Sequence, residues 1–411
     1  MVNSVIIAGG GMSGFQTASS LRDLGFEGEI PIVDGGVHAP YDRPPLSKDY
    51  FLGKASVSDL EFAQHEWYAE KKVALELGSR VTALDAENAT ITLENGKTLS
   101  ADAIVLSFGG DARQLPLDNG KATNIHVLRT LEDADALKKS LHEGTKLFII
   151  GAGLIGAETA SSAKKLGASV TLIDPFEPPI QQIVGPDIAS YMHAHHAQND
   201  IRTLKGTVAS LEEDERGNFT AAITDSGERI EFDQLLVGIG IIPNTQVAQA
   251  AGLDVDNGIL VDASHRTSAP KIFACGDVAR TRLANGDLIR RNEHWESARL
   301  SGTATARGIL GLEPEEHDSH WFWSDREGIH LEVAGDMIAD AENVWRGSTA
   351  DDSFVLFRVN GTQLVGAASI NDSMAVRAAR RIIESGIAVD AAKLADPDIN
   401  LRQLTIKKNQ Q

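Results

Sequence analysis

The chain has 411 residues, of which 42% are hydrophobic, so it is long enough for two or three domains with cores of their own. Its formal net charge of −20 disfavours nucleic acid as a partner, because the phosphates would be repelled. No apolar run reaches the roughly 18 residues of a membrane span, and the first residues lack the features of a signal peptide, so we expect a cytoplasmic protein with no membrane partner.

A glycine-rich fingerprint follows the first apolar run of the chain. Gly9, Gly11 and Gly14 form a G-x-G-x-x-G pattern between a predicted strand and a predicted helix. In dinucleotide-binding units the first glycine allows a tight turn, the second lets the backbone approach a pyrophosphate, and the third lets the helix pack on the strand. Asp34 ends the next predicted strand, where a carboxylate can bind an adenosine ribose.

A second fingerprint, formed by Gly151, Gly153 and Gly156, repeats this plan. Asp174 ends its second strand, and no basic residue follows in residues 175–179. An acid at this point favours NADH over NADPH, because the 2′-phosphate would face a negative charge. Two fingerprints in one chain indicate two bound dinucleotides, with electrons or a hydride passing between them.

The order of the later strands indicates that the first nucleotide-binding domain is split. A glycine-rich strand end at Gly240, which we include among the nucleotide-binding glycines, closes the second unit, and two further strands then return to the first domain. We expect the first domain to comprise residues 1–112 and 243–315. The second domain, residues 113–242, is then inserted between these two parts.

From residue 316 to residue 411 the pattern becomes that of antiparallel strands and one helix. Asn360 and Gly361 predict a hairpin turn between two such strands. Ser373 is expected to cap a helix that Gly386 ends. The sequence therefore predicts an α/β protein with two Rossmann-like nucleotide-binding domains and a C-terminal α+β domain.

The single cysteine excludes a redox-active dithiol within the chain. Cys275 has no partner and lies at a predicted buried strand end, so we interpret it as a small core residue. His193, His195 and His196 fall in a helical stretch, but His195 points away from the other two. We therefore expect no metal site.

Both fingerprints occur together with three further motif segments, residues 40–48, 273–279 and 321–325. The combination resembles the FAD-dependent NADH:ferredoxin reductases of bacterial oxygenase systems, nearest to those of toluene- and biphenyl-type dioxygenases and related to putidaredoxin reductase. The resemblance implies a glutathione-reductase-like flavoprotein with FAD in the split domain and NADH in the inserted one. It also implies that electrons pass singly to an acidic [2Fe-2S] ferredoxin. This ferredoxin feeds a ring-hydroxylating dioxygenase or a cytochrome P450, so the oxygenase is reached only through it.

The resemblance assigns catalytic roles to three residues. Lys48 matches a lysine beside the flavin, where a cation stabilises negative charge, although a solvated surface lysine is the alternative. Glu158 matches a glutamate near the nicotinamide, or it is a helix N-terminal acid that interacts with the helix dipole. Trp323 matches a residue between flavin and ferredoxin, and it shares a strand face with Trp321; packing between domains is the alternative.

The resemblance also assigns FAD contacts outside the fingerprint. They are Arg43 near the phosphates, Val81 beside the adenosine, Arg129, Asp277 on the ribityl chain and Trp295 at the flavin edge.

Two segments depart from the family pattern. In Asp34-Gly35-Gly36 the acid comes one or two positions earlier than usual, and Ser107-Phe108-Gly109 replaces Ala-Thr-Gly. Ser107 can supply the threonine hydroxyl, whereas Phe108 is unexpected.

The alternatives are a rubredoxin reductase, an NADH oxidase and a flavoprotein like apoptosis-inducing factor. NADH oxidases of this fold use an early cysteine, and residues 41–48 contain none. A signalling flavoprotein would turn over slowly, so fast reduction of an added ferredoxin by NADH separates the remaining possibilities.

For the ferredoxin we predict a basic docking patch of Arg377, Arg380 and Arg381 on one helix face, extended by Arg290, Arg291 and Arg326.

Overall fold

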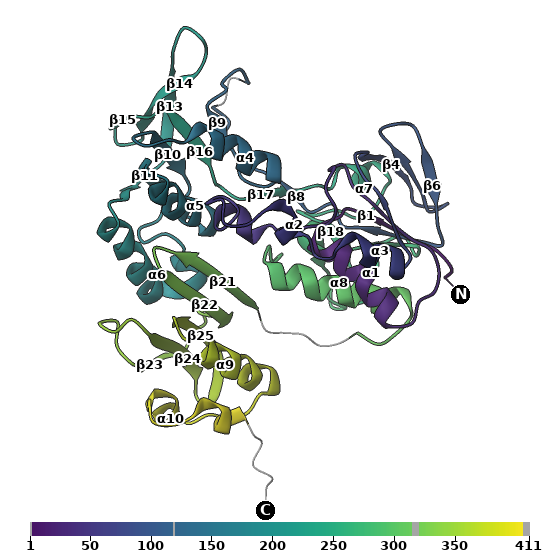
Figure 1. Ribbon diagram of the computed structural model, residues 1–411. Coiled ribbons are helices and arrows are strands. Elements are labelled where there is room, and N and C mark those ends of the chain that lie inside the picture. Colours follow the sequence, from purple (N-terminus) through teal and green to yellow (C-terminus); the bar gives the residue numbers. More distant parts are fainter. Residues whose placement is uncertain (1, 118–119, 315–319, 406–411) are drawn as a thin grey trace, which may run out of the picture. The chain divides into compact units, whose positions relative to one another are not determined.

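The structure is a computed structural model that describes residues 2–117, 120–314 and 320–405. The chain forms two compact units, each built from segments that are distant in sequence (Figure 1). The first unit comprises Met1–Pro44, Ala55–Asp111 and Ile241–His317, and the second comprises Pro45–Lys54, Ala112–Gly240 and Asp318–Gln411. The predicted boundary between residues 315 and 316 lies outside the described residues, and the four predicted domain ranges stay a prediction.

The first unit is built on a five-stranded parallel sheet. Its strands, in spatial order, are β19 (Ile272–Ala274), β7 (Ala103–Leu106), β1 (Val5–Ala8), β2 (Ile30–Val33) and β3 (Val73–Glu76). The central strands β1 and β7 are buried at every residue, as strands with both faces covered require. Strand β19 pairs with β7, so the chain returns to this sheet after residue 240.

Helices and a small sheet cover the two faces of this parallel sheet. The helices α1 (Met12–Asp23) and α8 (Trp295–Ile309) lie side by side and pack on one face (Figure 1). The antiparallel strands β4 (Val81–Asp85), β5 (Thr90–Leu93) and β6 (Thr98–Ser100) contribute to the core on the other face. The remaining elements of this unit are α2 (Val57–Leu60), α3 (His65–Glu70), α7 (Gln246–Ala250), β17 (Ile241–Pro243), β18 (Ile259–Val261), η2 (Gly276–Val278) and β20 (Ala279–Thr281).

The second unit contains another five-stranded parallel sheet. Its spatial order is β12 (Arg202–Lys205), β11 (Ser169–Asp174), β10 (Lys146–Ile150), β16 (Gln234–Val237) and β9 (Ile125–His126). The helices of this part are α4 (Leu131–Ser140), α5 (Leu154–Lys165) and α6 (Gln181–Gln198). An antiparallel side sheet consists of β13 (Val208–Glu213), β14 (Phe219–Thr224) and β15 (Arg229–Glu231). The elements η1 (Pro44–Ser47) and β8 (Gly110–Ala112) each include a sequence boundary between segments of the two units.

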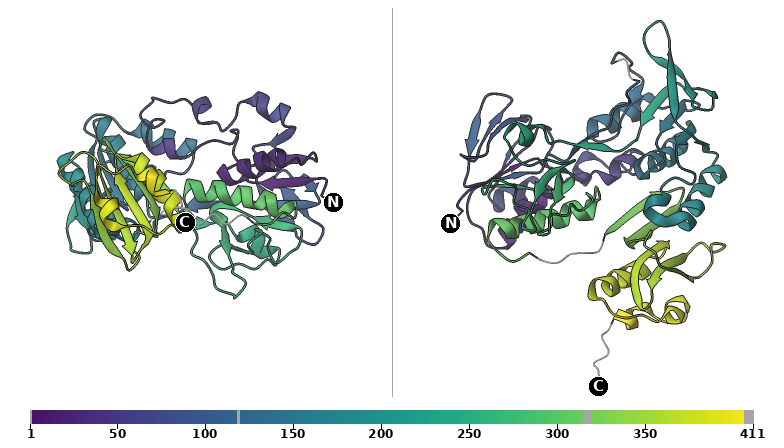
Figure 2. Two further views of the ribbon diagram at one scale, coloured as in Figure 1. Left: turned by 90° about the horizontal axis from the view of Figure 1, so that it is seen from below. Right: turned by 180° about the vertical axis from the view of Figure 1, so that it is seen from behind.

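The C-terminal part of the second unit is an antiparallel sheet, seen from behind in Figure 2. Its spatial order is β21 (Trp321–Arg326), β22 (Ile329–Gly335), β25 (Gln363–Ile370), β24 (Phe354–Asn360) and β23 (Glu342–Arg346). The helix α9 (Ser373–Ser385) packs on one face, and residues of α6 pack on the other. Two short helices follow, α10 (Ala391–Ala395) and η3 (Leu401–Thr405).

The predicted hairpin and helix of this region are present, with one correction. Asn360 pairs with Gln363 across the turn between β24 and β25. The cap of α9 is Asp372 rather than Ser373, because the Asp372 carboxylate accepts a hydrogen bond from the backbone N–H of Ala375 at 3.0 Å. Gly386 ends the helix with a φ of 60°.

A search of the described ranges finds no helix that is both long and apolar enough to cross a membrane.

Candidate active site

The first fingerprint has the geometry of a pyrophosphate cradle. A Cβ on Gly14 would lie 2.0 Å from the carbonyl oxygen of Gly9, and a Cβ on Gly9 would lie 2.2 Å from the carbonyl oxygen of Ser107. A Cβ on Gly11 would meet no atom within 4 Å, so the backbone of this residue faces open space. Gly11 is also the N-cap of α1 and supplies no capping side chain, which leaves helix N–H groups for a phosphate.

The second fingerprint has the same geometry. A Cβ on Gly156 would lie 2.0 Å from the carbonyl oxygen of Gly151, and one on Gly151 would lie 2.4 Å from that of Gly238. Gly153 faces open space as the N-cap of α5, and Gly240 does so with a φ of +93°. Both fingerprints therefore fit a dinucleotide by the shape of their backbone.

The acids that end β2 and β11 hold the fingerprint loops, a role that the sequence analysis missed. Asp34 Oδ2 accepts the N–H of Gly10 at 2.5 Å, and Asp174 Oδ2 accepts the N–H of Ala152 at 2.9 Å. The second oxygen of each carboxylate accepts the N–H two residues further along, at 2.6 and 2.9 Å. A carboxylate has about four acceptor positions, so each acid can also bind a ribose hydroxyl.

Ser107 explains one departure from the family pattern. Its hydroxyl donates to the carbonyl oxygens of Ala8 at 3.0 Å and Gly9 at 2.8 Å, so it braces the first fingerprint as a threonine hydroxyl could. Phe108 packs against the core of the first unit as a partly buried side chain.

The other predicted FAD residues lie on several elements. Within the first unit, Arg43 precedes η1, Val81 begins β4 with 8% exposure, and Asp277 lies in η2. Trp295 begins α8, and its indole Nε1 donates to Asp42 at 2.8 Å. Arg129 belongs to the second unit, just before α4. Their contacts with FAD stay predictions.

Glu158 is the centre of a buried polar cluster in the second unit. The residue is 6% exposed, and its carboxylate accepts hydrogen bonds from the hydroxyls of Ser47 at 2.6 Å and Ser324 at 2.7 Å. Lys48 Nζ lies 3.3 Å from Glu158 Oε1. Burial raises the pKa of Glu158, and the Lys48 charge opposes this shift. Glu158 is the fifth residue of α5, outside the first turn, so a cation rather than the helix dipole stabilises its charge.

Lys48 links this cluster to the C-terminal sheet. Its side chain is only 15% exposed, and its Nζ donates to Asp325 Oδ2 at 2.9 Å. The same Nζ lies 5.6 Å from the ring centre of Trp323, a cation–π arrangement. The surface-lysine alternative is therefore wrong for Lys48.

The two tryptophans of β21 share a face, as predicted. The ring centres of Trp321 and Trp323 are 5.0 Å apart with an interplanar angle of 31°. The guanidinium of Arg380 from α9 lies 5.2 Å from the ring centre of Trp321. The tilted tryptophan pair thus connects the surroundings of Lys48 with Arg380 in the second half of the predicted docking helix.

Several residues of this cluster received no role in the sequence analysis. Ser47, Ser324 and Asp325 lie inside the motif segments, next to Lys48 and Trp323. The alternation of side chains along β21 was the sequence signal that could have found Ser324 and Asp325, because it places them on opposite faces of an edge strand. His330 and Glu332, on the neighbouring strand, carried no motif.

The histidines of α6 have protein partners. His196 Nδ1 lies 2.9 Å from Glu327 Oε1, both side chains being buried, and His195 Nδ1 lies 2.9 Å from the carbonyl oxygen of Tyr191. Within the described ranges, no three His, Cys, Asp or Glu side chains are grouped as metal ligands.

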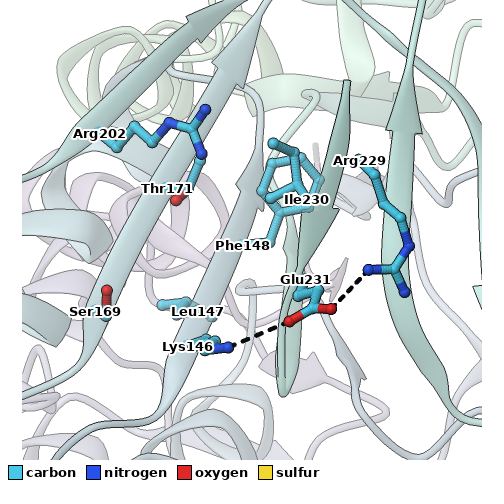
Figure 3. A pocket seen from close by; sticks show the side chains of 9 residues that line it. All are labelled: Lys146, Leu147, Phe148, Ser169, Thr171, Arg202, Arg229, Ile230 and Glu231. Atoms are coloured by element: carbon cyan, nitrogen blue, oxygen red, sulfur yellow. Dashed lines mark hydrogen bonds and ion pairs between the residues drawn. The ribbon is translucent and has the colours of Figure 1, made fainter. Parts of the chain in front are cut away.

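A pocket beside the parallel sheet of the second unit is not a fingerprint site (Figure 3). It has a volume of about 350 Å³ and lies where Lys146 and Ser169 begin β10 and β11, the opposite strand ends from the glycines. Its three cations are paired: Lys146 and Arg229 both contact Glu231, at 3.6 and 2.7 Å (Figure 3), and Arg202 contacts Glu228. It therefore offers no free charge to a nucleotide phosphate.

The chain was compared with protein-family models. Residues 3–302 match the pyridine nucleotide-disulphide oxidoreductase family, and residues 321–405 match the reductase C-terminal domain. The chain belongs to the pyridine nucleotide-disulphide oxidoreductases. This confirms the predicted fold class, the prediction of an NADH-dependent oxidoreductase, and FAD and NADH as its cofactors.

Relatives named as reductases match this oxidoreductase over nearly all of its length. The ferredoxin–NAD(+) reductase subunit of the benzene 1,2-dioxygenase system of Pseudomonas putida is 34% identical, over 98% of each chain. Putidaredoxin reductase of Pseudomonas putida is 33% identical, over 98% of this chain and 96% of its own. The crystal structure of the covalent putidaredoxin reductase–putidaredoxin complex has a TM-score of 0.92, at 32% identity and 98% coverage of both chains. The predicted resemblance is confirmed.

The family name includes disulphides, but this oxidoreductase has one cysteine. Cys275 is fully buried, and burial raises the pKa of its thiol to about 11, so almost no thiolate exists at neutral pH. We predict that Cys275→Ala keeps the wild-type rate of flavin reduction by NADH and loses about 1 kcal/mol of stability. Stopped-flow absorbance and thermal unfolding test this, and a folded, FAD-loaded variant without hydride transfer would contradict it.

The predicted docking patch of this oxidoreductase needs correction. Arg377 and Arg381 are exposed on α9, while Arg380 is partly buried against Trp321. Arg326 is only 3% exposed, and the Arg291 side chain is 7% exposed and paired with an acid. The proposed extension to Arg291 and Arg326 is therefore wrong, because these cations are turned inward.

Proposed function

We propose that the chain is an NADH-dependent ferredoxin reductase. It takes a hydride from NADH onto FAD and passes electrons one at a time to an acidic [2Fe-2S] ferredoxin, which supplies a ring-hydroxylating dioxygenase or a cytochrome P450. The observation that carries this proposal is the 33–34% identity to two such reductases over 98% of the chain, C-terminal domain included. We place the protein in the cytoplasm, where NADH is available, and we keep the predicted domain ranges.

The residues of the chain divide the work between binding and electrostatics. The two fingerprints bind pyrophosphates through backbone N–H groups, and Asp34 after β2 and Asp174 at the end of β11 bind the riboses. FAD, when bound, supplies the chemistry that accepts a hydride and releases single electrons. The ammonium of Lys48 stabilises the negative charge that hydride transfer delivers. Glu158, held by its two serine partners, keeps this ammonium in place. Trp323 lies against Lys48 and is proposed to face the electron exit.

Anaerobic reduction of the FAD-loaded protein tests this function. Addition of NADH should bleach the flavin absorbance within the dead time of manual mixing, and an oxidised [2Fe-2S] ferredoxin added next should become reduced. Rubredoxin and ferricyanide serve as comparison acceptors. Fast reduction by NADH with transfer to rubredoxin but to no [2Fe-2S] protein would identify a rubredoxin reductase. Slow reduction with a persistent charge-transfer band would identify a signalling flavoprotein.

We predict a preference for NADH over NADPH of at least about tenfold in kcat/KM, which equals about 1.4 kcal/mol. The reason is Asp174, whose carboxylate lies at the end of β11 beside the second fingerprint and would repel a 2′-phosphate. Steady-state kinetics with both nucleotides test it. The variant Asp174→Asn should show a smaller difference in kcat/KM between NADH and NADPH, while it keeps the hydrogen bond from Ala152. Equal kcat/KM values for the two nucleotides in the wild type would exclude this role of Asp174.

A further inference from the structure

A line of alternating charges crosses the edge of the C-terminal sheet. It begins at the buried Glu158 and continues through Lys48, at 3.3 Å, to Asp325, at 2.9 Å. Asp325 Oδ1 lies 2.6 Å from His330 Nδ1, and His330 Nε2 lies 2.9 Å from Glu332 Oε1. The predicted reaction uses only the first two of these residues, so the other three have no assigned role.

The register of β21 and β22 places this line by backbone geometry. Asp325 and His330 are direct cross-strand partners in an antiparallel pair, so their side chains share a face. Glu332 is two residues from His330 and therefore lies on the same face. Because Ser324 points to the opposite face and binds Glu158, Lys48 connects the two faces around the edge strand.

His330 is held between two carboxylates. Although burial opposes protonation, the hydrogen bonds to Asp325 and Glu332 raise the pKa of His330 above its ordinary value. Burial also acts to raise the pKa of Asp325, but the His330 and Lys48 partners outweigh it and lower that pKa. The backbone N–H of His330 donates to Asn371, which carries no charge. The imidazolium therefore persists to a higher pH than that of an ordinary histidine and is lost as the pH rises through the raised pKa.

We propose that His330 is a positioning residue for Lys48. Its proton sets how much of the negative charge of Asp325 acts on Lys48, so that the rate of hydride acceptance depends on a proton held on the C-terminal sheet. This inference rests on the proposed reductase function. With the imidazolium present, Asp325 shares its negative charge between two cations. Without it, Lys48 alone compensates Asp325, and less of the ammonium's charge remains for Glu158 and for the negative charge that a hydride brings.

The first test measures the proton directly. In ¹³C-histidine-labelled, FAD-loaded protein, the His330 resonance is identified by its absence in His330→Gln and titrated by NMR. We expect its pKa to rise in Lys48→Met, which removes a nearby cation, and to fall in Asp325→Asn, which removes an anion. By linkage the pKa should also differ between the oxidised and the NADH-reduced holoprotein. An unchanged His330 pKa in all three comparisons would overturn the coupling.

The second test is the pH profile of NADH oxidation with ferricyanide as the acceptor, over roughly pH 6 to 9. We expect the wild-type kcat/KM to fall about fivefold as His330 loses its proton. His330→Gln should stay near the low value throughout, whereas His330→Arg, which keeps a cation, should stay near the high value. His142→Gln is the matched control, since His142 is an exposed histidine of the same unit, and it should reproduce the wild-type profile.

The two proposals can fail separately. A wild-type protein that oxidises NADH and reduces a [2Fe-2S] ferredoxin, but shares its pH profile with His330→Gln, overturns only the role of His330. A wild-type protein that reduces no ferredoxin overturns the proposed function, while the NMR comparisons still decide whether His330 and Lys48 are coupled.

Discussion

Replacing Lys48 by methionine is expected to slow flavin reduction by NADH about 100-fold, the usual loss when one preorganised electrostatic partner is removed. Lys48 is 15% exposed and bonded to both Glu158 and Asp325, so no other side chain of the described cluster can take its place. Methionine keeps an unbranched side chain out to the ε position and lacks only the charged nitrogen. Burial already raises the pKa of Glu158, and we expect this carboxyl to take up a proton in the variant and the protein to fold.

Stopped-flow absorbance at the flavin band measures this effect, with retained FAD as the check on folding. Lys54→Met is the control, because Lys54 lies in the same segment with 66% of its side chain exposed. Glu158→Gln separates the two members of the pair, since glutamine can keep the bonds to Ser47 and Ser324 without the charge. A wild-type rate in FAD-loaded Lys48→Met would exclude an electrostatic role for Lys48.

Reversing the charges of Arg377 and Arg381 is expected to reduce the rate of ferredoxin reduction at low salt about tenfold or more. Both side chains are exposed on α9, whose neighbouring Arg380 lies over the ring of Trp321. The chain carries a net charge of −20, so an acidic ferredoxin is attracted only where cations gather. The double variant Arg377→Glu/Arg381→Glu removes this attraction without touching Lys48 or the fingerprints.

The measurement compares ferredoxin reduction with ferricyanide reduction over a range of salt concentrations. The difference between wild type and double variant should shrink as salt rises, because screening weakens steering. Ferricyanide reduction should change much less. Lys165→Glu/Arg216→Glu makes the same change of net charge at exposed positions elsewhere in the second unit. If this control loses as much ferredoxin activity as the double variant, α9 is not the docking face.

Much of the nucleotide-binding fold follows from local patterns in the sequence. Each fingerprint lies between a buried strand and a helix within one short stretch of chain, so Gly9, Gly14, Gly151 and Gly156 could be placed without tertiary information. The hairpin at Asn360 is equally local. The inward orientation of Arg326 was not predictable in this way, because burial of its guanidinium depends on packing and on Glu158 from α5 as well as on the adjacent Glu327.

By itself the sequence determined that two dinucleotide sites exist, that no dithiol is available, and which family the chain resembles. These properties depend on residue types at short spacing or on composition. Only the tertiary structure decided that Lys48, Glu158 and Asp325 form one cluster, since they come from three segments that are far apart in the chain. It also decided that His330 lies between two carboxylates. Charged side chains acquire their partners through strand register and helix packing, and a single sequence does not specify which distant side chains will meet.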